Sequence, residues 1–249
     1  MKIDILTLFP EMFLNFLETS IVGRAVNKNI VQINCINIRD FSKDKHKRVD
    51  DYPFGGGPGM VMRPEPVYDA INSVKDRDSK VIYLSPKGKT YNQEIAISLS
   101  KEKHIILLCG HYEGIDNRII DNYIDEEISI GDYILTGGEI PAMVVVDSVI
   151  RLLPGVLSNQ ESYIDDSYYN GLLEYPHYTR PKIFNGIEVP EVLLSGNHEK
   201  INQWRKYESL KITYERRPDL IEKLHLNNDE KEMLKDIIQK NNNEIKNKL

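Results

Sequence analysis

Apolar residues in the first two thirds of the chain form short continuous runs that alternate with segments of helical spacing. The runs are IDILTLF, VQINCINI, KVIYL, HIILLCG and the shorter EEISI, and they are typical of buried strands. Helical spacing appears in YNQEIAISLSKEK and IDNRIIDNY, and residues 140–153 predict one strongly apolar helix that Pro141 opens near its first turn. This alternation predicts an α/β layer structure with a mainly parallel sheet.

The pattern changes after Pro154. Residues 155–190 are polar, rich in tyrosine, proline and glycine, and without a sustained period, which is typical of a long linker. Helical spacing then returns from Asn197 onward, and the polar end of the chain, residues 241–249, is expected to fray. We therefore expect three parts: an α/β domain over residues 1–158, an interdomain linker over 159–175, and a small, mainly helical domain over 176–249.

Composition and charge narrow the class of protein. The first residues, MKIDILTLFPEMF, lack the features of a secretory signal, and the longest apolar segment is shorter than the ~20 apolar residues of a membrane helix. We expect a cytoplasmic protein with no membrane partner. The two cysteines, Cys35 and Cys109, lie within apolar runs, as buried residues of a reducing compartment do, and their spacing does not fit a zinc site.

A formal net charge of −6 argues against a protein that holds nucleic acid by bulk attraction. Two stretches are locally basic, residues 43–48 and residues 205–217. Each is either part of a nucleic-acid surface or a solvated face of the protein.

Two glycine-containing segments resemble nucleotide-binding motifs without matching them. SPKGKT follows a predicted strand, but Tyr83 stands where a phosphate-binding loop needs its first glycine. FGGGPGM has Met60 where a dinucleotide-binding loop needs its third glycine. We therefore reject an NTPase and a dinucleotide-binding fold, and we interpret residues 55–59 as a mobile, lid-like loop.

Three predicted strands end in unusual loops: YLSPKG at 83–88, CGHYEGID at 109–116 and SIGDYILTGGEIP at 129–141. Ligands of open α/β sheets bind at the carboxyl ends of strands, so these loops are expected to form the walls of one site. The paired glycine, Gly137 and Gly138, either forms a tight turn or lets a ligand or another piece of backbone come close.

Several motifs occur here in an order that resembles a known family. MKIDILTLFPEMF, FGGGPGMVM, YLSPKGKTYNQ, CGHYEGIDNR, SIGDYILTGGEIPAM, RLLPGVL and LLEYPHYTRP look like the bacterial tRNA (guanine-N1)-methyltransferases, which are knotted, SPOUT-type methyltransferases. The resemblance extends from Met1 to about Trp204 and weakens in the C-terminal helices.

The resemblance implies S-adenosylmethionine as methyl donor, bound in a bent shape inside a deep trefoil knot at the C-terminal part of the α/β domain. The matching cofactor positions are Tyr83, Leu84, Ser85, Pro86, Gly110, Tyr112, Glu113, Gly114, Ser129, Ile130, Gly131, Tyr133, Leu135, Gly137 and Gly138. This chain departs from the family at Lys87, where relatives commonly have glutamine.

The resemblance also implies which residues carry the reaction. Asp166 matches the base that removes the N1 proton of guanine, and its alternative is an aspartate in a local backbone turn. Arg151 matches the guanidinium that stabilises charge on the guanine O6, and its alternative is a helix salt bridge with Asp147. Glu113 is expected to hold the guanine edge or to balance the sulfonium charge; otherwise it is a surface glutamate.

The implied substrate is the anticodon loop of tRNA, methylated at guanosine 37, with no DNA partner. His177, Tyr178 and Arg180 combine aromatic faces with cationic donors that suit single-stranded bases and phosphates, although a proline-rich loop packed on its own domain has the same residues. His111 and His46 are expected to be structural or solvated. No carboxylate cluster predicts a metal site, so any magnesium is expected to arrive with the RNA.

The resemblance further implies a symmetric homodimer in which the linker of one subunit completes the site of the other. Two other functions stay open: a non-catalytic RNA-binding protein on the same scaffold, and an enzyme that methylates a ribose hydroxyl of ribosomal RNA. The linker aspartate favours base methylation, because a ribose hydroxyl has no N1 proton to remove.

Overall fold

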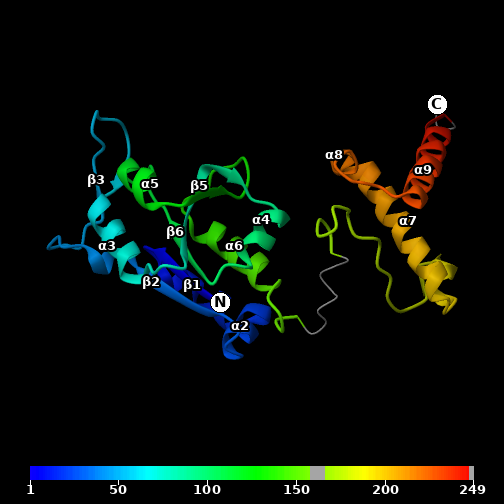
Figure 1. The fold of residues 1–249 in the computed structure, drawn as a ribbon, viewed down its shortest axis with the longest axis horizontal. Coiled ribbons are helices and arrows are strands. Elements are labelled where there is room, and N and C mark those ends of the chain that lie inside the picture. Colours follow the sequence, from blue (N-terminus) through cyan, green and yellow to red (C-terminus); the bar gives the residue numbers. More distant parts are fainter. Residues whose placement is uncertain (158–165, 247–249) are drawn as a thin grey trace. The chain divides into compact units, whose positions relative to one another are not determined.

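The chain divides into two compact units, Met1–Gln160 and Glu161–Leu249, in a computed structural model that describes residues 1–157 and 166–246 (Figure 1). The predicted end of the first domain at residue 158 and the start of the predicted linker, residues 159–165, lie outside the described residues. The rest of the predicted linker belongs to the second unit, where Leu172 is buried.

The first unit is built on a five-stranded sheet in the order β2-β1-β6-β5-β7. Every neighbouring pair is parallel, which confirms the predicted α/β architecture. Each of the five apolar runs forms one strand: β1 Lys2–Thr7, β2 Gln32–Asn37, β5 Ser79–Thr90, β6 His104–Cys109 and β7 Glu126–Ser129.

Helices cover both faces of this sheet, because successive strand residues alternate between two apolar cores. On one face, Ile3, Ile5 and Leu107 pack with residues of α2 Ser20–Asn27, α4 Gln93–Leu99 and α6 Glu139–Ile150. On the other face, Leu6, Ile106 and Leu108 pack with α3 Pro64–Val74, α5 Asn117–Tyr123 and the 3-10 turn η2 Ile38–Phe41. Figure 1 shows the two groups of helices on opposite sides of the sheet.

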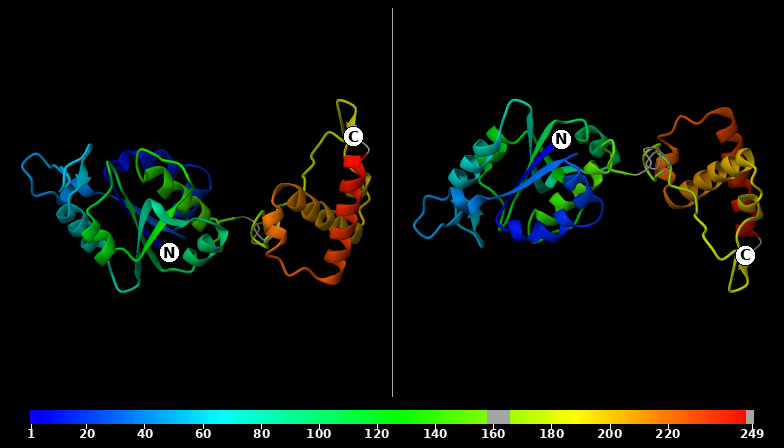
Figure 2. Two further views of the ribbon diagram at one scale, coloured as in Figure 1. Left: turned by 90° about the horizontal axis from the view of Figure 1, so that it is seen from above. Right: turned by 90° about the horizontal axis from the view of Figure 1, so that it is seen from below.

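The chain around the glycine-rich loop forms a separate small hairpin, β3 Asp50–Asp51 with β4 Val61–Met62. Its glycines 55, 56, 57 and 59 all have positive φ, a conformation that residues with side chains rarely adopt. The base of the hairpin is fixed, because the Met62 amide donates to the Gly114 carbonyl and the Glu113 amide donates to the Met60 carbonyl, each at 2.9 Å. Figure 2 shows this part of the chain projecting from the first unit.

Strand β5 is irregular at the point where the predicted loop begins. Its register against β7 shifts between Leu84 and Lys89, so residues 85–88 leave the ladder and the strand then resumes to Thr90. At Gly88, β5 and β7 come so close that a Cβ would lie 2.4 Å from the backbone carbon of Glu127 and the backbone nitrogen of Ile128. Only glycine fits this crossing.

The second unit is mainly helical, with α7 His198–Arg216, the short α8 Pro218–Ile221 and α9 Asn228–Lys246. Helices α7 and α9 pack through a small apolar core of Leu172, Leu210 and Ile237. Helix α9 continues to Lys246, into the stretch that the sequence predicts to fray. Extending a helix that Ile237 already anchors is far less costly than starting one, even through an asparagine tract.

A second small hairpin joins β8 Ile183–Phe184 to β9 Ile187–Glu188. Its turn residues Asn185 and Gly186 both have positive φ, as a two-residue hairpin turn requires. The short 3-10 helix η4 Glu191–Leu194 follows. The sequence predicted neither element, because residues 155–190 have no sustained period and the domain over 176–249 was expected to be mainly helical.

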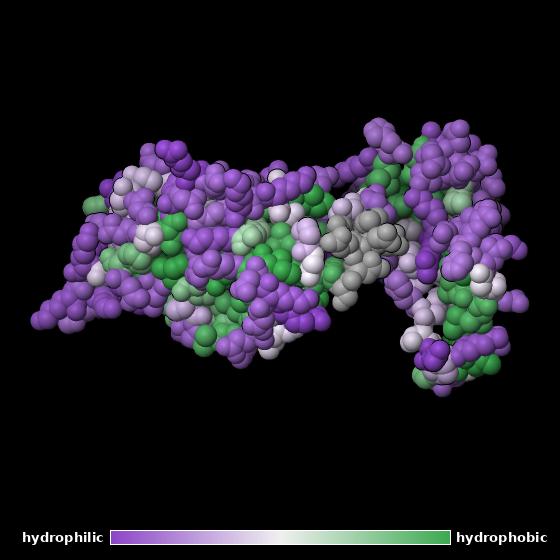
Figure 3. Space-filling view, turned by 60° about the horizontal axis from the view of Figure 1, so that its bottom comes forward, coloured by the Kyte–Doolittle hydropathy of each residue, from purple (hydrophilic) through white to green (hydrophobic). Residues whose placement is uncertain are grey.

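The remaining elements of the first unit are the short 3-10 helix η1 Pro10–Phe13 and α1 Leu14–Glu18, which join β1 to α2. Figure 3 shows a mainly hydrophilic surface with smaller apolar areas on both units. Among the described residues, no helix has both the length and the apolar character needed to span a membrane.

Replacing Gly88 by alanine tests the crossing of β5 and β7. The added Cβ meets backbone on β7, which cannot move as a flexible side chain would, so we expect the thermal midpoint to fall by roughly 2 to 12 °C. The control is Lys89→Ala, which removes an exposed side chain from the neighbouring position. Equal midpoints for the two variants in thermal unfolding followed by circular dichroism would contradict the close approach.

Candidate functional site

A cavity of about 990 Å³ lies in the first unit where β5, β6 and β7 end. The three loops that leave these strands form most of its walls. All the predicted cofactor positions line it, from Tyr83 to Pro86 on the first loop, from Gly110 to Gly114 on the second and from Ser129 to Gly138 on the third. The volume is that of a site for a small molecule of nucleotide size or larger.

Contacts within the protein explain the paired glycine. A Cβ on Gly138 would lie 2.6 Å from the Cα of Cys109, and the Gly138 amide donates to the Gly110 carbonyl at 3.0 Å. A Cβ on Gly137 would lie 2.3 Å from His111 Nε2 and 2.5 Å from Glu139 Oε2. Of the alternatives that the sequence left open, close backbone accounts for Gly138. Gly137 instead lies against a pair of polar side chains, which the sequence did not predict.

The wall formed by the second loop is shaped by Tyr83. Its hydroxyl lies against Gly110, where a Cβ would come within 2.8 Å of it. Burial, and then the nearby carboxylate of Glu127, raise the pKa of Tyr83 to about 12, so the phenol is neutral at physiological pH. The loop itself turns through Tyr112 and Gly114, which both have positive φ.

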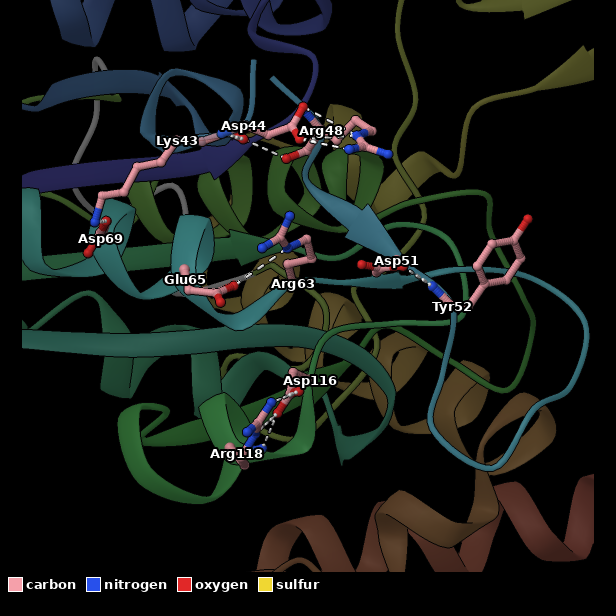
Figure 4. A network of polar contacts seen from close by, with 11 residues as sticks. Lys43, Asp44, Arg48, Asp51, Tyr52, Arg63, Glu65, Asp69, Asp116 and Arg118 are labelled. Carbon is pink, nitrogen blue, oxygen red and sulfur yellow. Dashed lines mark hydrogen bonds and ion pairs between the residues drawn. The ribbon is translucent and has the colours of Figure 1, made fainter. Parts of the chain in front are cut away.

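The outer wall carries charges that sequence reasoning did not assign to the site. It includes Asp51, Arg63 and Arg118, together with the uncharged Tyr52 of the hairpin; Asp116, the last residue of the predicted second loop, lies beside Arg118. Arg118 pairs with Asp116 at 2.7 Å, and this contact lowers the pKa of the Asp116 carboxyl. Figure 4 shows this pair and the Arg63–Glu65 pair beside the hairpin, with the Tyr52 ring pointing away from them.

The local sequence explains the position of Asp116. It is the N-cap of α5, and its carboxylate accepts a hydrogen bond from the Arg118 amide at 2.9 Å. The hydrogen bond from Met62 to Gly114 and the β-bridge between Met62 and Ile115 hold the hairpin against the turn at 113–115, so the hairpin also lines the cavity. The signal in the sequence was the glycine-rich loop, which we interpreted as a lid without identifying its charged flanks as wall residues.

Residues 1–223 match the family described as tRNA (Guanine-1)-methyltransferase TrmD. The chain belongs to this family. A tRNA (guanine-N(1)-)-methyltransferase of Alkaliphilus metalliredigens is 57% identical over 96% of this chain and 99% of the relative.

Two further relatives with the same name support the TrmD assignment. The protein of Clostridium novyi is 60% identical over 94% of this chain and 97% of its own length. That of Ruminiclostridium cellulolyticum is 61% identical over 90% of this chain and 97% of its own length. The resemblance inferred from the motifs is therefore confirmed.

The TrmD-type catalytic candidates lie in different units. Arg151 is the C-cap of α6 in the first unit, and its amide donates to the Asp147 carbonyl at 3.3 Å. It is not among the residues that line the cavity. Asp166 belongs to the second unit, where its carbonyl accepts a hydrogen bond from the Tyr169 amide at 3.2 Å.

Of the predicted substrate residues, Glu113 lines the cavity of the first unit, and His177, Tyr178 and Arg180 lie on the second unit. The ring of His177 is 2.7 Å from a Glu174 carboxylate oxygen, and the ring of Tyr178 lies 6.3 Å from that of Trp204. The guanidinium of Arg205 lies over the Tyr175 ring at 5.0 Å. Arg180, two residues beyond Tyr178, is exposed. Trp204 and Arg205 extend the aromatic and cationic surface beyond the residues predicted from the sequence.

No group of three or more histidine, cysteine, aspartate or glutamate side chains in the described part of the chain is placed to hold a metal ion.

The reactivity of Cys109 tests the packing beneath the cavity. This thiol is fully buried and burial raises its pKa well above the ordinary value, so in a Cys35→Ser background we expect its alkylation at pH 8 to be at least ~100-fold slower than in the unfolded chain. Adding Gly138→Ala should increase the rate, because its Cβ pushes against the Cys109 backbone.

The control for that substitution is Gly186→Ala in the turn of the β8–β9 hairpin of the second unit, which strains a positive φ but adds a Cβ with no atom within 4 Å. Mass spectrometry of the labelled protein gives the rates. Rapid labelling in the Cys35→Ser background, or equal rates for the two alanine variants, would show that Gly138 is not packed against Cys109.

Proposed function

We propose that this protein transfers a methyl group from S-adenosylmethionine to N1 of guanosine 37, just 3′ of the anticodon of tRNA. The observation that carries the proposal is the single cavity at the ends of β5, β6 and β7, whose walls contain every family cofactor position. Membership of the TrmD family, with relatives named tRNA (guanine-N(1)-)-methyltransferase, supports the same reaction.

The cavity wall suits this cofactor. Gly110, Gly114 and Gly131 line the cavity without adding side chains of their own, which leaves room for a flat ligand of nucleoside size. Tyr83 stays neutral beside a cationic ligand, and Glu113 contributes a carboxylate that would balance a sulfonium. When bound, S-adenosylmethionine supplies an electrophilic methyl group and leaves as a neutral thioether.

The protein's part in the reaction is to make guanine N1 nucleophilic. Asp166 accepts the N1 proton as the new N–CH₃ bond forms, and the guanidinium of Arg151 stabilises the negative charge that builds on O6. Glu113 holds the guanine edge. Magnesium, where it takes part, comes with the RNA.

The surface of the second unit supports tRNA as the substrate. His177, Tyr178 and Arg180, extended by Trp204 and Arg205, offer aromatic faces and cations to the splayed bases and phosphates of an anticodon loop. We assign tRNA binding to residues 176–249 and the interdomain linker to 159–175. A tRNA substrate also implies a cytoplasmic enzyme.

Two close backbone crossings support a deep trefoil knot. Gly88 lies against Glu127 and Ile128, and Gly138 lies against Cys109, in both cases with no room for a Cβ. Threading one loop through another requires such contacts between segments far apart in the sequence, whereas most folds avoid threading altogether.

Exposed apolar residues of the first unit support a symmetric homodimer. Ile140 and Val144, one helical turn apart on α6, are 48% and 41% exposed, and Tyr133 and Ile134 on the preceding loop are more so. Large exposed apolar patches mark interaction sites, and a dimer about this face would let the linker of one subunit reach the cavity of the other.

Incubation with labelled S-adenosylmethionine and whole tRNA, followed by nucleoside analysis, tests the proposed activity. We expect 1-methylguanosine at position 37. Label on a ribose would instead identify a ribose methyltransferase, and binding of tRNA without any transfer would identify a non-catalytic RNA-binding protein.

Asp166→Asn tests the assignment of the base. It removes the proton acceptor and keeps the shape, so kcat should fall by roughly 10²- to 10⁴-fold, while S-adenosylmethionine affinity in calorimetry stays near that of the parent. Asp165→Asn is the matched control, since it makes the same change at the adjacent position. Turnover within a few-fold of the parent in Asp166→Asn would remove this residue from the mechanism.

Hybrid dimers test whether the site is shared. Leu135→Arg puts a bulky cation into the cavity wall, which should exclude the cationic cofactor, and Asp166→Ala removes the base. Each variant should be inactive alone, whereas their co-expressed hybrid should regain one working site from the intact loops of one chain and the intact aspartate of the other. Inactive hybrids, alongside active hybrids of the parent with the double variant, would show that Asp166 serves its own subunit.

A further inference from the structure

A buried polar cluster lies beneath the cavity where three chain segments meet. Glu139, at the start of α6, is 2% exposed, and both of its carboxylate oxygens have partners. Oε1 accepts a hydrogen bond from the Thr7 hydroxyl at 2.7 Å, and Oε2 lies 2.9 Å from His111 Nε2. Such a carboxylate is stable in a core only while these partners stay in place.

The Thr7 contact has a fixed direction. Thr7 Oγ1 already accepts from the Phe9 amide at 2.9 Å, so its own proton goes to Glu139. Glu139 therefore accepts at Oε1, and at Oε2 His111 donates in the tautomer that carries its proton on Nε2. The His111 ring also lies 4.9 Å from the ring of Phe9, and Gly137 covers the His111–Glu139 contact with no room for a side chain.

His111 is also the first residue of the turn that forms the second wall of the cavity. Its carbonyl accepts a hydrogen bond from the Gly114 amide at 3.0 Å, and the chain between them turns through Tyr112 at a φ of 58°. Glu113, at the tip of this turn, lines the cavity, and its amide donates a hydrogen bond to the Met60 carbonyl. The side chain of His111 is thus the anchor of the turn, and Glu139 holds that anchor.

We propose that His111 is a positioning residue: through its hydrogen bond to Glu139 it fixes the turn that presents Tyr112, Glu113 and Gly114 to the methyl donor and the guanine. The inference rests on the proposed function and adds to it a residue that makes no bond to the reacting atoms. Catalytic groups need placement to within a fraction of an ångström, and a shift of about 1 Å can lower the rate by about 10²-fold.

His111→Ala and His111→Gln separate positioning from simple packing. In His111→Ala we expect kcat, at saturating S-adenosylmethionine and tRNA, to fall about 10- to 100-fold, and the Kd for S-adenosylmethionine measured by calorimetry to rise at least about threefold. In His111→Gln both values should return to within about threefold of the parent, because the glutamine Nε2 can donate to the same Glu139 oxygen.

Val149→Ala is the control, because it removes buried apolar volume from α6 without touching a hydrogen bond of the polar cluster. We expect a lower thermal midpoint than in the parent, with kcat within about threefold of the parent. If turnover instead follows the thermal midpoint across all three variants, or if glutamine restores neither kcat nor Kd, His111 only packs and the inference is wrong.

The failure of the proposed function is distinguishable from this outcome. A parent protein that makes no 1-methylguanosine from tRNA overturns the proposed function, whatever the variants do. In that case the calorimetric Kd for S-adenosylmethionine still decides the role of His111: weaker binding in the alanine variant with recovery in the glutamine variant supports positioning, and an unchanged Kd overturns it.

Discussion

Contact between backbone segments that have no side chains between them is the constraint on which the rest of this structure depends. The Cα of Cys109 lies so near Gly138 that even a methyl group is excluded, and the hydrogen bond from the Gly138 amide to Gly110 joins the end of β6 to the start of α6. The same closeness recurs where Gly88 of β5 meets β7. Because these segments are in direct backbone contact, the loops that leave them converge on one cavity and do not spread along the edge of the sheet.

This constraint also sets the chemistry of the cavity wall. Glycines at the crossings bring backbone segments into contact without adding side chains, and the buried phenol of Tyr83 remains neutral. Charged pairs such as Arg118 with Asp116 also line the cavity; they are partly exposed, so water screens them and each contributes little to stability. The lining therefore combines neutral groups with charged ones, among them Lys87 and Glu113.

Sequence pattern predicted the sheet well, because strands buried on both faces must be continuously apolar. It did not show the irregular register of β5 after Leu84, since nothing in SPKGKT reveals which neighbouring strand it meets. The contribution of Asp51 and Arg63 to the cavity was missed for a related reason: a hairpin reaches this wall only through hydrogen bonds to a turn some fifty residues later. Pairing between distant segments is a property of the fold, and the local pattern that identified Gly137 and Gly138 as special could not say that His111 and Cys109 were the neighbours.

The proposed reaction explains why a base from outside the cavity wall is needed. Of the carboxylates on the three loops, Glu113 stands at the tip of the turn that His111 anchors. A carboxylate that balances a sulfonium must remain ionised while the methyl group is held, so it cannot also take the N1 proton in the same step without losing that balance. The proposed base is therefore a different carboxylate, Asp166. It belongs to the same unit as His177, Tyr178 and Arg180. In the proposed reaction this would couple removal of the proton to recognition of the substrate, because the base and the proposed RNA surface are parts of one unit.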